Sequence, residues 1–234
     1  MSAVLLVRHG QASFGESDYD ALSDLGARQS RVLGQALAAR GVEPAVLLCG
    51  TMQRHRQTLE HVAEAAGWIT TPTEVDNGWD EFDHEQVIEL HQPAYRSQTM
   101  KADPTSTLTE RQAFQEMFEA ATTRWSAGEH DEEYTESYPV FGHRVQEALR
   151  RTSSMAESKQ AVVVFTSGGP VSRVCASILD PFEKCGPQLW GRLNVVTINT
   201  AVTKIVIGGR GQTLVSVNDH SHLEAYEPGL VTYR

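Results

Sequence analysis

Three short apolar runs dominate the hydrophobic pattern of the chain: Ala3–Val7, Ala45–Cys49 and Ala161–Phe165. Their valines and leucines are nearly continuous and do not alternate with polar residues. Such runs are typical of parallel strands that are covered on both faces. Further along the chain, apolar stretches predict additional strands over Val195–Asn199, Val202–Ile207 and Leu214–Val217.

Helix-like segments follow the three runs. The first covers Asp24–Arg40, where Ser23 is a suitable N-cap and Gly41 a helix stop. The second covers Met52–Ala66, and the third begins near Pro170, a residue type that suits the first turn of a helix. The alternation of strands and helices predicts an α/β fold, a three-layer α/β/α sandwich with a mostly parallel sheet.

The alternation is interrupted between residues 76 and 138. This part of the chain predicts a helix over Glu110–Trp125 and contains an acidic run, Glu129–Glu136, which we expect to be a solvated loop. A helix over Phe141–Glu157 follows. We therefore interpret residues 1–234 as a single domain with a helical insertion at about 76–138.

Charge and composition narrow the classes of function. The chain has 234 residues, 40% of them apolar, with 20 Lys and Arg against 30 Asp and Glu, so its net charge is −10. This balance argues against nucleic acid or an anionic membrane as a partner. No signal-peptide pattern and no apolar run of transmembrane length is present in the sequence, so a cytoplasmic protein is expected.

The three cysteines, Cys49, Cys175 and Cys185, have neither metal-ligand spacing nor the even number of a disulfide framework. Cys49 ends an apolar run and is expected to be a buried thiol. The sequence therefore predicts no metal site.

Candidate chemistry gathers where the three buried strands end. The first strand is followed by Arg8-His9-Gly10-Gln11, the second by Gly50–Arg56, and the third by Thr166–Pro170. In an open parallel sheet, ligands bind beyond the carboxyl ends of the strands. Arginines, an imidazole, hydroxyls and a helix start at one sheet edge suit a phosphate group.

Arg8-His9-Gly10 after an amino-terminal strand resembles the signature of the histidine phosphatase superfamily, also called the phosphoglycerate mutase-like family. Other similar segments follow in the family's order, and the second of them resembles the family stretch ending Arg-Ala-Xaa-Gln-Thr. They are LSDLGARQS (Leu22–Ser30), GTMQRHRQTLE (Gly50–Glu60), FGHRVQEAL (Phe141–Leu149) and VNDHSHLE (Val217–Glu224). The resemblance extends over nearly the whole chain.

The resemblance implies roles for particular residues. His9 would be the nucleophile that forms a phosphohistidine, with its other ring nitrogen held by a backbone carbonyl. Arg8 and Arg54 would clamp the phosphoryl oxygens. Glu81 would be the proton donor, with Asp80 and Asp83 raising its pKa; Asp83 is the alternative donor.

Additional residues are expected to bind the substrate: Gln11, Ser13, Ser167 and Gly168. The partner would be a small phosphorylated substrate or a phosphate ion, and no organic or metal cofactor is implied. Nothing in the sequence indicates the oligomeric state.

Two positions depart from the family pattern. Ser167 stands where the resemblance predicts a second histidine in a His-Gly-Gly turn. A hydroxyl brings no positive charge, so slower turnover or weaker phosphate affinity is expected, and Ser167→His is expected to keep or raise activity. His55 and His220 are candidates to replace the missing imidazole, and Ser167 could instead cap the following helix. Gly15 replaces a phosphate-contacting asparagine, which disfavours a mutase.

Three functions therefore remain open. The favoured one is a phosphomonoester hydrolase that acts through phospho-His9. The second is a catalytically weakened protein on the same fold that binds a phosphorylated ligand. The third, ranked last, is a cofactor-dependent phosphoglycerate mutase.

Overall fold

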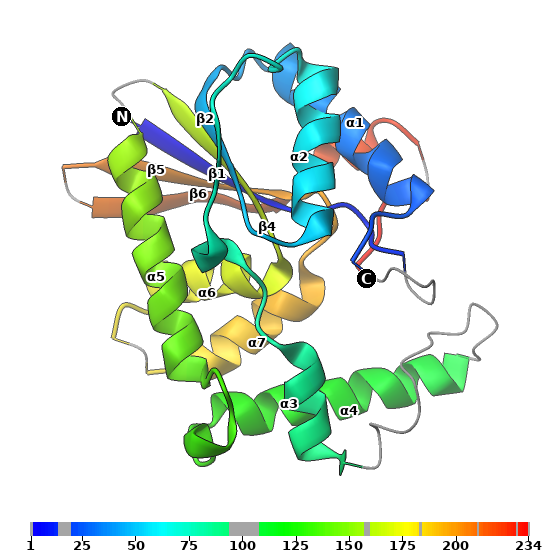
Figure 1. The fold of residues 1–234 in the computed structure, drawn as a ribbon, viewed down its shortest axis with the longest axis vertical. Coiled ribbons are helices and arrows are strands. Elements are labelled where there is room, and N and C mark those ends of the chain that lie inside the picture. The colour runs from blue at the N-terminus through cyan, green and yellow to red at the C-terminus, as the bar shows by residue number, and fades with distance from the viewer. Residues whose placement is uncertain are drawn as a thin grey trace.

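The structure of the chain is a computed structural model, and it describes residues 2–13, 20–93, 108–156, 160–182, 184–209, 211–227 and 229–233. Within these residues, six strands form one sheet in the order β3-β2-β4-β1-β5-β6 (Figure 1). The strands are β1 (Ser2–Arg8), β2 (Pro44–Cys49), β3 (Thr73–Val75), β4 (Ala161–Thr166), β5 (Val202–Gly208) and β6 (Gly211–Asp219). The first four are parallel to one another, whereas β5 is antiparallel to both of its neighbours, β1 and β6.

Helices cover both faces of this sheet (Figure 1). They are α1 (Asp24–Ala39), α2 (Gln53–Ala66), α3 (His84–His91), α4 (Leu108–Ser126), α5 (Tyr138–Met155), α6 (Gly168–Leu179), α7 (Gly186–Val196) and α8 (Ser221–Glu224). Two short 3-10 helices, η1 (Asn77–Trp79) and η3 (Asp131–Glu133), join them.

The burial of these strands confirms the prediction that the apolar runs are strands covered on both faces. In β1, Leu5 and Val7 pack in one cluster with residues of α1 and α2, whereas Val4 and Leu6 pack in another with residues of α5, α6 and α7. All four side chains are buried. Because successive residues of a strand face opposite sides, a strand between two helical layers must be apolar throughout. The fold is thus the predicted α/β/α sandwich.

The helix boundaries follow the expected signals. Ser23 caps α1, its hydroxyl accepting a hydrogen bond from the Gly26 amide at 3.1 Å. Gly41 and Gly67, which follow α1 and α2, have left-handed backbone conformations, with φ of 67° and 75°. Local sequence signals therefore account for the start of α1 and for the ends of both helices, whereas α2 begins after Met52 without a side-chain cap.

The prediction of a strand over Val195–Asn199 is wrong. Val195 and Val196 end helix α7, where both are exposed, and the Thr197 hydroxyl donates to the Leu193 carbonyl at 2.8 Å, as in a helical turn. Two adjacent valines suggested a strand, but helix α7 continues through them from Pro187 in its first turn. The predicted strands at Val202–Ile207 and Leu214–Val217 lie within β5 and β6.

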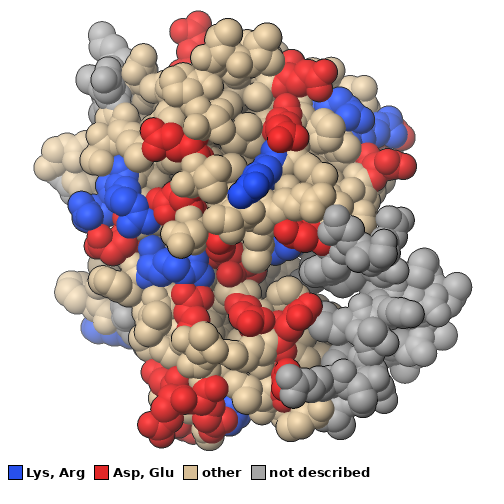
Figure 2. Space-filling view, viewed as in Figure 1, with Lys and Arg blue, Asp and Glu red and all other residues tan. Residues whose placement is uncertain are grey.

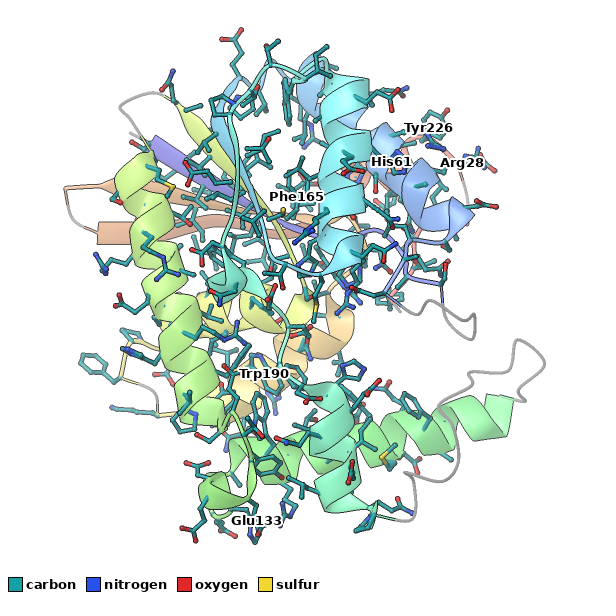
Figure 3. The ribbon with its side chains drawn as sticks, viewed as in Figure 1. Arg28, His61, Glu133, Phe165, Trp190 and Tyr226 are labelled. Carbon is teal, nitrogen blue, oxygen red and sulfur yellow. The ribbon has the colours of Figure 1, made fainter. Side chains whose placement is uncertain are left out.

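Aromatic packing fixes the lower part of the molecule in Figure 1 to the sandwich. Trp190 of α7, labelled in Figure 3, lies with its ring centroid 5.6 Å from Trp125 of α4 and 5.7 Å from Phe82. Tyr138 and Phe141 of α5 complete the cluster. Each large buried side chain of this kind stabilises the fold by about 3–5 kcal/mol relative to alanine.

The acidic run Glu129–Glu136 lies beside this cluster, and Figure 2 shows the acidic side chains gathered at the same lower edge. It is not wholly a solvated loop, because Glu136 forms a two-point ion pair with Arg144. The buried thiol expected at Cys49 is confirmed, and burial raises its pKa to about 11. Within the described ranges, no helix is both long enough and apolar enough to cross a membrane.

Candidate active site

The carboxyl ends of β1, β4 and β2 meet at one edge of the sheet. The His9 amide, just after β1, donates to the carbonyl of Thr166 in β4 at 2.8 Å. The Gly50 amide, just after β2, donates to the carbonyl of Phe165 at 3.2 Å. The three sequence stretches singled out above therefore lie side by side, as expected for parallel strands.

The His9 imidazole is buried and has a defined tautomer. Its Nδ1 lies 2.6 Å from the carbonyl oxygen of Gly10, the kind of contact expected from the sequence. Because a carbonyl oxygen can only accept, Nδ1 carries the proton and Nε2 keeps its lone pair. Burial, and then the charges of Arg54 and Arg8, hold the pKa of His9 well below its usual range. The ring is therefore neutral near pH 7.

Hydrogen bonds to its backbone carbonyls hold the segment that carries His9. The Asn199 side-chain amide donates to the His9 carbonyl at 3.0 Å, and the Thr200 amide donates to the Arg8 carbonyl at 3.0 Å. Thr200 adopts a left-handed conformation with φ of 59°, unusual for a β-branched residue and typical of a strained functional turn. Sequence reasoning missed both residues, since it assigned Asn199 to a strand.

The two arginines are held differently. Arg8 Nη1 donates to the main-chain carbonyls of Thr197 and Tyr233, so its guanidinium is tied to two distant segments. Arg54, in the first turn of α2, is buried and donates from Nη1 to Asp20 at 2.6 Å. Among the described residues, Arg54 Nε is buried and has no hydrogen-bond partner. No sequence signal singled out Asp20.

Glu81 lies opposite, on the segment between η1 and α3. Its carboxylate accepts from the Gly169 amide at 3.1 Å and from the Phe82 amide at 3.2 Å. Burial raises the pKa of Glu81, although the Gly169 hydrogen bond and the charges of Arg54 and Arg8 oppose the shift. Desolvation of the carboxyl is therefore the cause, and the expectation that neighbouring aspartates would raise this pKa is wrong.

Two contacts fix the position of Glu81. A Cβ on Gly169 would lie only 2.0 Å from Glu81 Oε1, so a glycine is required for the carboxyl to approach helix α6. Arg144 of α5 donates to the Asp80 carbonyl at 2.8 Å and holds the same segment from the other side. Asp83, the alternative proton donor, is exposed and accepts from the Gln86 amide as the N-cap of α3.

Of the four residues expected to bind substrate, two lie in the segment after β1 and two at the start of α6. Gln11 uses its side-chain oxygen to accept from Ser23, and the Ser13 amide donates to the Ala21 carbonyl. Gly168 begins α6, where a Cβ would lie 3.7 Å from Arg8 Nε. Ser167 precedes α6 but makes no capping hydrogen bond with its side chain. The inference drawn from Gly15 lies outside the described residues.

Of the two histidines proposed to replace the missing imidazole, the structure brings one to Ser167. His55 Nε2 lies 2.7 Å from Ser167 Oγ, and the His55 and His9 ring centroids are 5.7 Å apart. His220 instead contacts the Asn218 carbonyl and Glu224. Among the described residues, no group of three or more His, Cys, Asp or Glu could hold a metal ion.

The fold resembles several solved structures over nearly its whole length. A phosphoserine phosphatase from Entamoeba histolytica, solved with phosphoserine, is 14% identical with a TM-score of 0.61, covering 95% of this chain and 100% of its own. A phosphoglycerate mutase from Bacillus anthracis is 16% identical with a TM-score of 0.61, covering 94% of each chain. A mycobacterial glucosyl-3-phosphoglycerate phosphatase is 16% identical with a TM-score of 0.58, covering 93% and 99%.

At these identities the structural similarity establishes the fold alone. Among curated proteins, no sequence matches the chain significantly. Residues 4–220 match the sequence model of the histidine phosphatase superfamily, branch 1. Because this match spans most of the 234 residues, the chain belongs to the histidine phosphatase superfamily.

Proposed function

We propose that the protein is a phosphomonoester hydrolase that acts through a phosphohistidine on His9. The observation that carries this proposal is the neutral His9 ring, whose Nδ1 is bound to the Gly10 carbonyl while Nε2 keeps its lone pair. The substrate would be a small phosphorylated metabolite, the class named for the phosphoserine and glucosyl-3-phosphoglycerate phosphatases that share the fold.

In the first step, His9 Nε2 attacks phosphorus and the bond from phosphorus to the ester oxygen breaks. The leaving oxygen takes the proton from the Glu81 carboxyl, so a neutral alcohol departs. The raised pKa of Glu81 favours the protonated carboxyl that this step needs. Arg8 and Arg54 stabilise the negative charge that spreads over the phosphoryl oxygens.

In the second step, water attacks the phosphorus of phospho-His9. The Glu81 carboxylate, left unprotonated by the first step, removes a proton from this water. The phosphorus–nitrogen bond breaks, inorganic phosphate forms, and both His9 and Glu81 return to their starting states. No metal ion or organic cofactor takes part in either step.

The leaving group would face the segment that contains Glu81 and the helices α3 and α4. We propose that these elements form the helical insertion of the single domain and select the alcohol part of the substrate. The aromatic cluster of Phe82, Trp125 and Trp190 supports this proposal, because it connects α4 and the Glu81 segment to α7.

Hydrolysis of p-nitrophenyl phosphate and of a panel of alkyl phosphomonoesters between pH 5 and 8 tests the proposal. His9→Ala is expected to lower kcat on the order of 10⁴-fold, since it removes the nucleophile. Rapid quenching of the unaltered protein with alkaline detergent, after mixing with labelled substrate, should trap an acid-labile, base-stable phosphoprotein that is absent from His9→Ala.

His61→Ala is a matched control, because His61 lies farther along α2, beside α1 (Figure 3). It should keep full turnover. Turnover by the unaltered protein no greater than by His9→Ala would refute the hydrolase and leave a phosphate-binding role, which calorimetric titration with inorganic phosphate would detect.

A further inference from the structure

The contact between His55 and Ser167 is not explained by packing alone. Both side chains are completely buried, and His55 Nε2 lies 2.7 Å from Ser167 Oγ, within hydrogen-bonding distance. Ser167 occupies the N-cap position of α6, yet its hydroxyl does not cap the helix. A serine at this position usually accepts a hydrogen bond from an amide of the helix that follows it, whereas the Ser167 hydroxyl pairs with an imidazole.

The other side of the His55 ring faces a fixed carboxylate. His55 Nδ1 lies 4.0 Å from Asp80 Oδ1 and has no hydrogen-bond partner among the described residues. Asp80 is itself held by Thr51, whose amide and hydroxyl both donate to it at 2.6 Å. A Cβ on Gly50 would lie 2.4 Å from His55 Nδ1 and 2.5 Å from Asp80 Oδ1, so the ring and the carboxylate face each other only because residue 50 is glycine.

The row formed by these three side chains ends beside the nucleophile. Ser167 follows Thr166, whose carbonyl accepts from the His9 amide, and the His55 ring is 5.7 Å from that of His9. A phosphoryl group on His9 presents only hydrogen-bond acceptors. Each hydrogen bond to such a group therefore needs a donor on the protein whose proton points toward a phosphoryl oxygen.

We propose that Asp80, His55 and Ser167 form a relay that positions a donor on the phosphoryl group. His55 Nε2–H donates to Ser167 Oγ, so the Ser167 hydroxyl proton is left for a phosphoryl oxygen. This arrangement requires the imidazolium form of His55, because Nδ1 faces the Asp80 carboxylate, which can only accept a hydrogen bond. Burial lowers the pKa of His55 in the free protein, so the bound anion and Asp80 together must stabilise the positive charge of the ring. His55 is a positioning residue, and Ser167 is the group that touches the phosphate.

This proposal rests on the proposed function. It places the second imidazole of the site on helix α2, as His55. The sequence comparison expected histidine near position 167 and alanine near position 55, whereas this chain has serine and histidine. Because Ser167 Oγ is 2.7 Å from His55 Nε2, a histidine at 167 has room only if His55 is also removed. Ser167→His alone is now expected to lower activity, which replaces the simpler expectation from the sequence.

A double-mutant cycle on kcat tests the relay. His55→Ala and Ser167→Ala should each lower kcat about 10- to 100-fold, the range for one hydrogen bond to a charged group. The double variant should be no worse than either single one, because the two residues act as one unit. His55→Ala combined with Ser167→His should recover most of the activity. Multiplicative losses, or full activity of His55→Ala, would overturn the proposal.

Two additional variants separate positioning from folding. His55→Gln fills the same buried space and keeps an N–H donor for Ser167, so it should retain more activity than His55→Ala at equal thermal stability. His61→Ala, on the same helix, should not change kcat. Equal losses in His55→Gln and His55→Ala would assign His55 a purely structural role.

Binding of inorganic phosphate, measured by calorimetry, keeps this test distinct from that of the hydrolase. If no His9-dependent turnover is found, the hydrolase fails, but the relay still predicts equal and non-additive losses of phosphate affinity in His55→Ala and Ser167→Ala. Unchanged phosphate affinity in both variants would overturn the relay whether or not the protein is a hydrolase.

Discussion

The two sides of the candidate site are built in different ways. On the phosphate side, Arg8 is the last residue of β1 and His9 directly follows it, and backbone hydrogen bonds to neighbouring strands and turns fix them. On the opposite side, Glu81 lies outside regular secondary structure. Its segment is held by groups that are far away in the sequence: Gly169, Arg144 and the aromatic cluster. A sheet edge can position groups with local contacts, whereas an irregular segment needs support from many elements.

Burial nevertheless has a common effect on the two sides. Removal from water disfavours a charged group, so burial lowers the pKa of His9 and raises that of Glu81. Both groups are thereby shifted toward the neutral form. A neutral imidazole is the form that attacks phosphorus, and a neutral carboxyl is the form that can donate a proton.

The largest expected effect tests the Glu81 side. Glu81→Gln should lower kcat by about 10²–10⁴-fold on alkyl phosphates, because an alkoxide leaves poorly without a proton donor. The loss on p-nitrophenyl phosphate should be much smaller, since nitrophenolate needs no proton to leave. Steady-state kinetics with both substrates provides the measurement. Equal losses would show that Glu81 does not protonate the leaving oxygen.

Arg54→Ala tests the phosphate side in the same assay. Its kcat should fall by about 10²–10³-fold, the usual loss on removing one donor to developing negative charge. The fall should be the same for both substrates, because the phosphoryl group is common to them. A loss that differed between the two substrates would show that Arg54 also acts on the leaving group, and would contradict the assignment of separate roles to the two sides. Arg56→Ala, which removes an exposed arginine from the same turn of α2, is the control.

Trp190 tests how the Glu81 side is supported. Trp190→Ala should lower the free energy of unfolding by about 3–5 kcal/mol, measured by urea denaturation. Its Nε1 donates to the Gly169 carbonyl at 3.1 Å, and the Gly169 amide donates to Glu81. The milder Trp190→Phe should therefore slow alkyl phosphates more than p-nitrophenyl phosphate.

A matched tryptophan lies on the other face of the sheet. Trp68 packs in the cluster shared by α1 and α2, which includes Phe165 (Figure 3). Trp68→Phe should cost stability without changing the ratio of the two rates. If both tryptophan variants changed that ratio, the support of Glu81 by the Trp190 cluster would be disproved.

The smallest expected effect is on the pH dependence of stability. Burial raises the folded-state pKa of Glu81 above its ordinary value of 4.5. The stability that this carboxyl contributes is fully present below the unfolded pKa and is lost as pH rises through the folded pKa. Glu81→Gln should therefore gain stability relative to the unaltered protein as pH rises above 4.5. Urea denaturation at several pH values measures this difference, and a constant difference would contradict the raised pKa.

The phosphate side could be predicted from the sequence because its signals are local. A continuous apolar run specifies a buried strand, and the residues just after it must lie at the sheet edge. Arg8 and His9 were placed in this way, as was the Ser23 cap of α1. The same reasoning failed at Val195–Asn199, where a preference of valine for strands competed with the helix begun at Pro187.

Contacts between distant segments could not be predicted. The pairing of His55 with Ser167 spans 112 positions in the sequence, and that of Arg54 with Asp20 spans 34. For Glu81, the sequence suggested the correct direction of the pKa shift but the wrong cause. Its neighbours in sequence are aspartates, whereas the fold surrounds its carboxyl with Gly169 and the aromatic cluster.

Arg8 donates a hydrogen bond to the Tyr233 carbonyl, so the candidate site depends on a segment far along the chain. Gln29 binds the same tail through the Leu230 carbonyl and Thr232. A carbonyl 225 positions away in the sequence thus holds this arginine. A molecule cut by a protease before residue 230 would keep its buried strands but leave Arg8 without the Tyr233 carbonyl. Phosphate affinity would then distinguish intact molecules from cleaved ones.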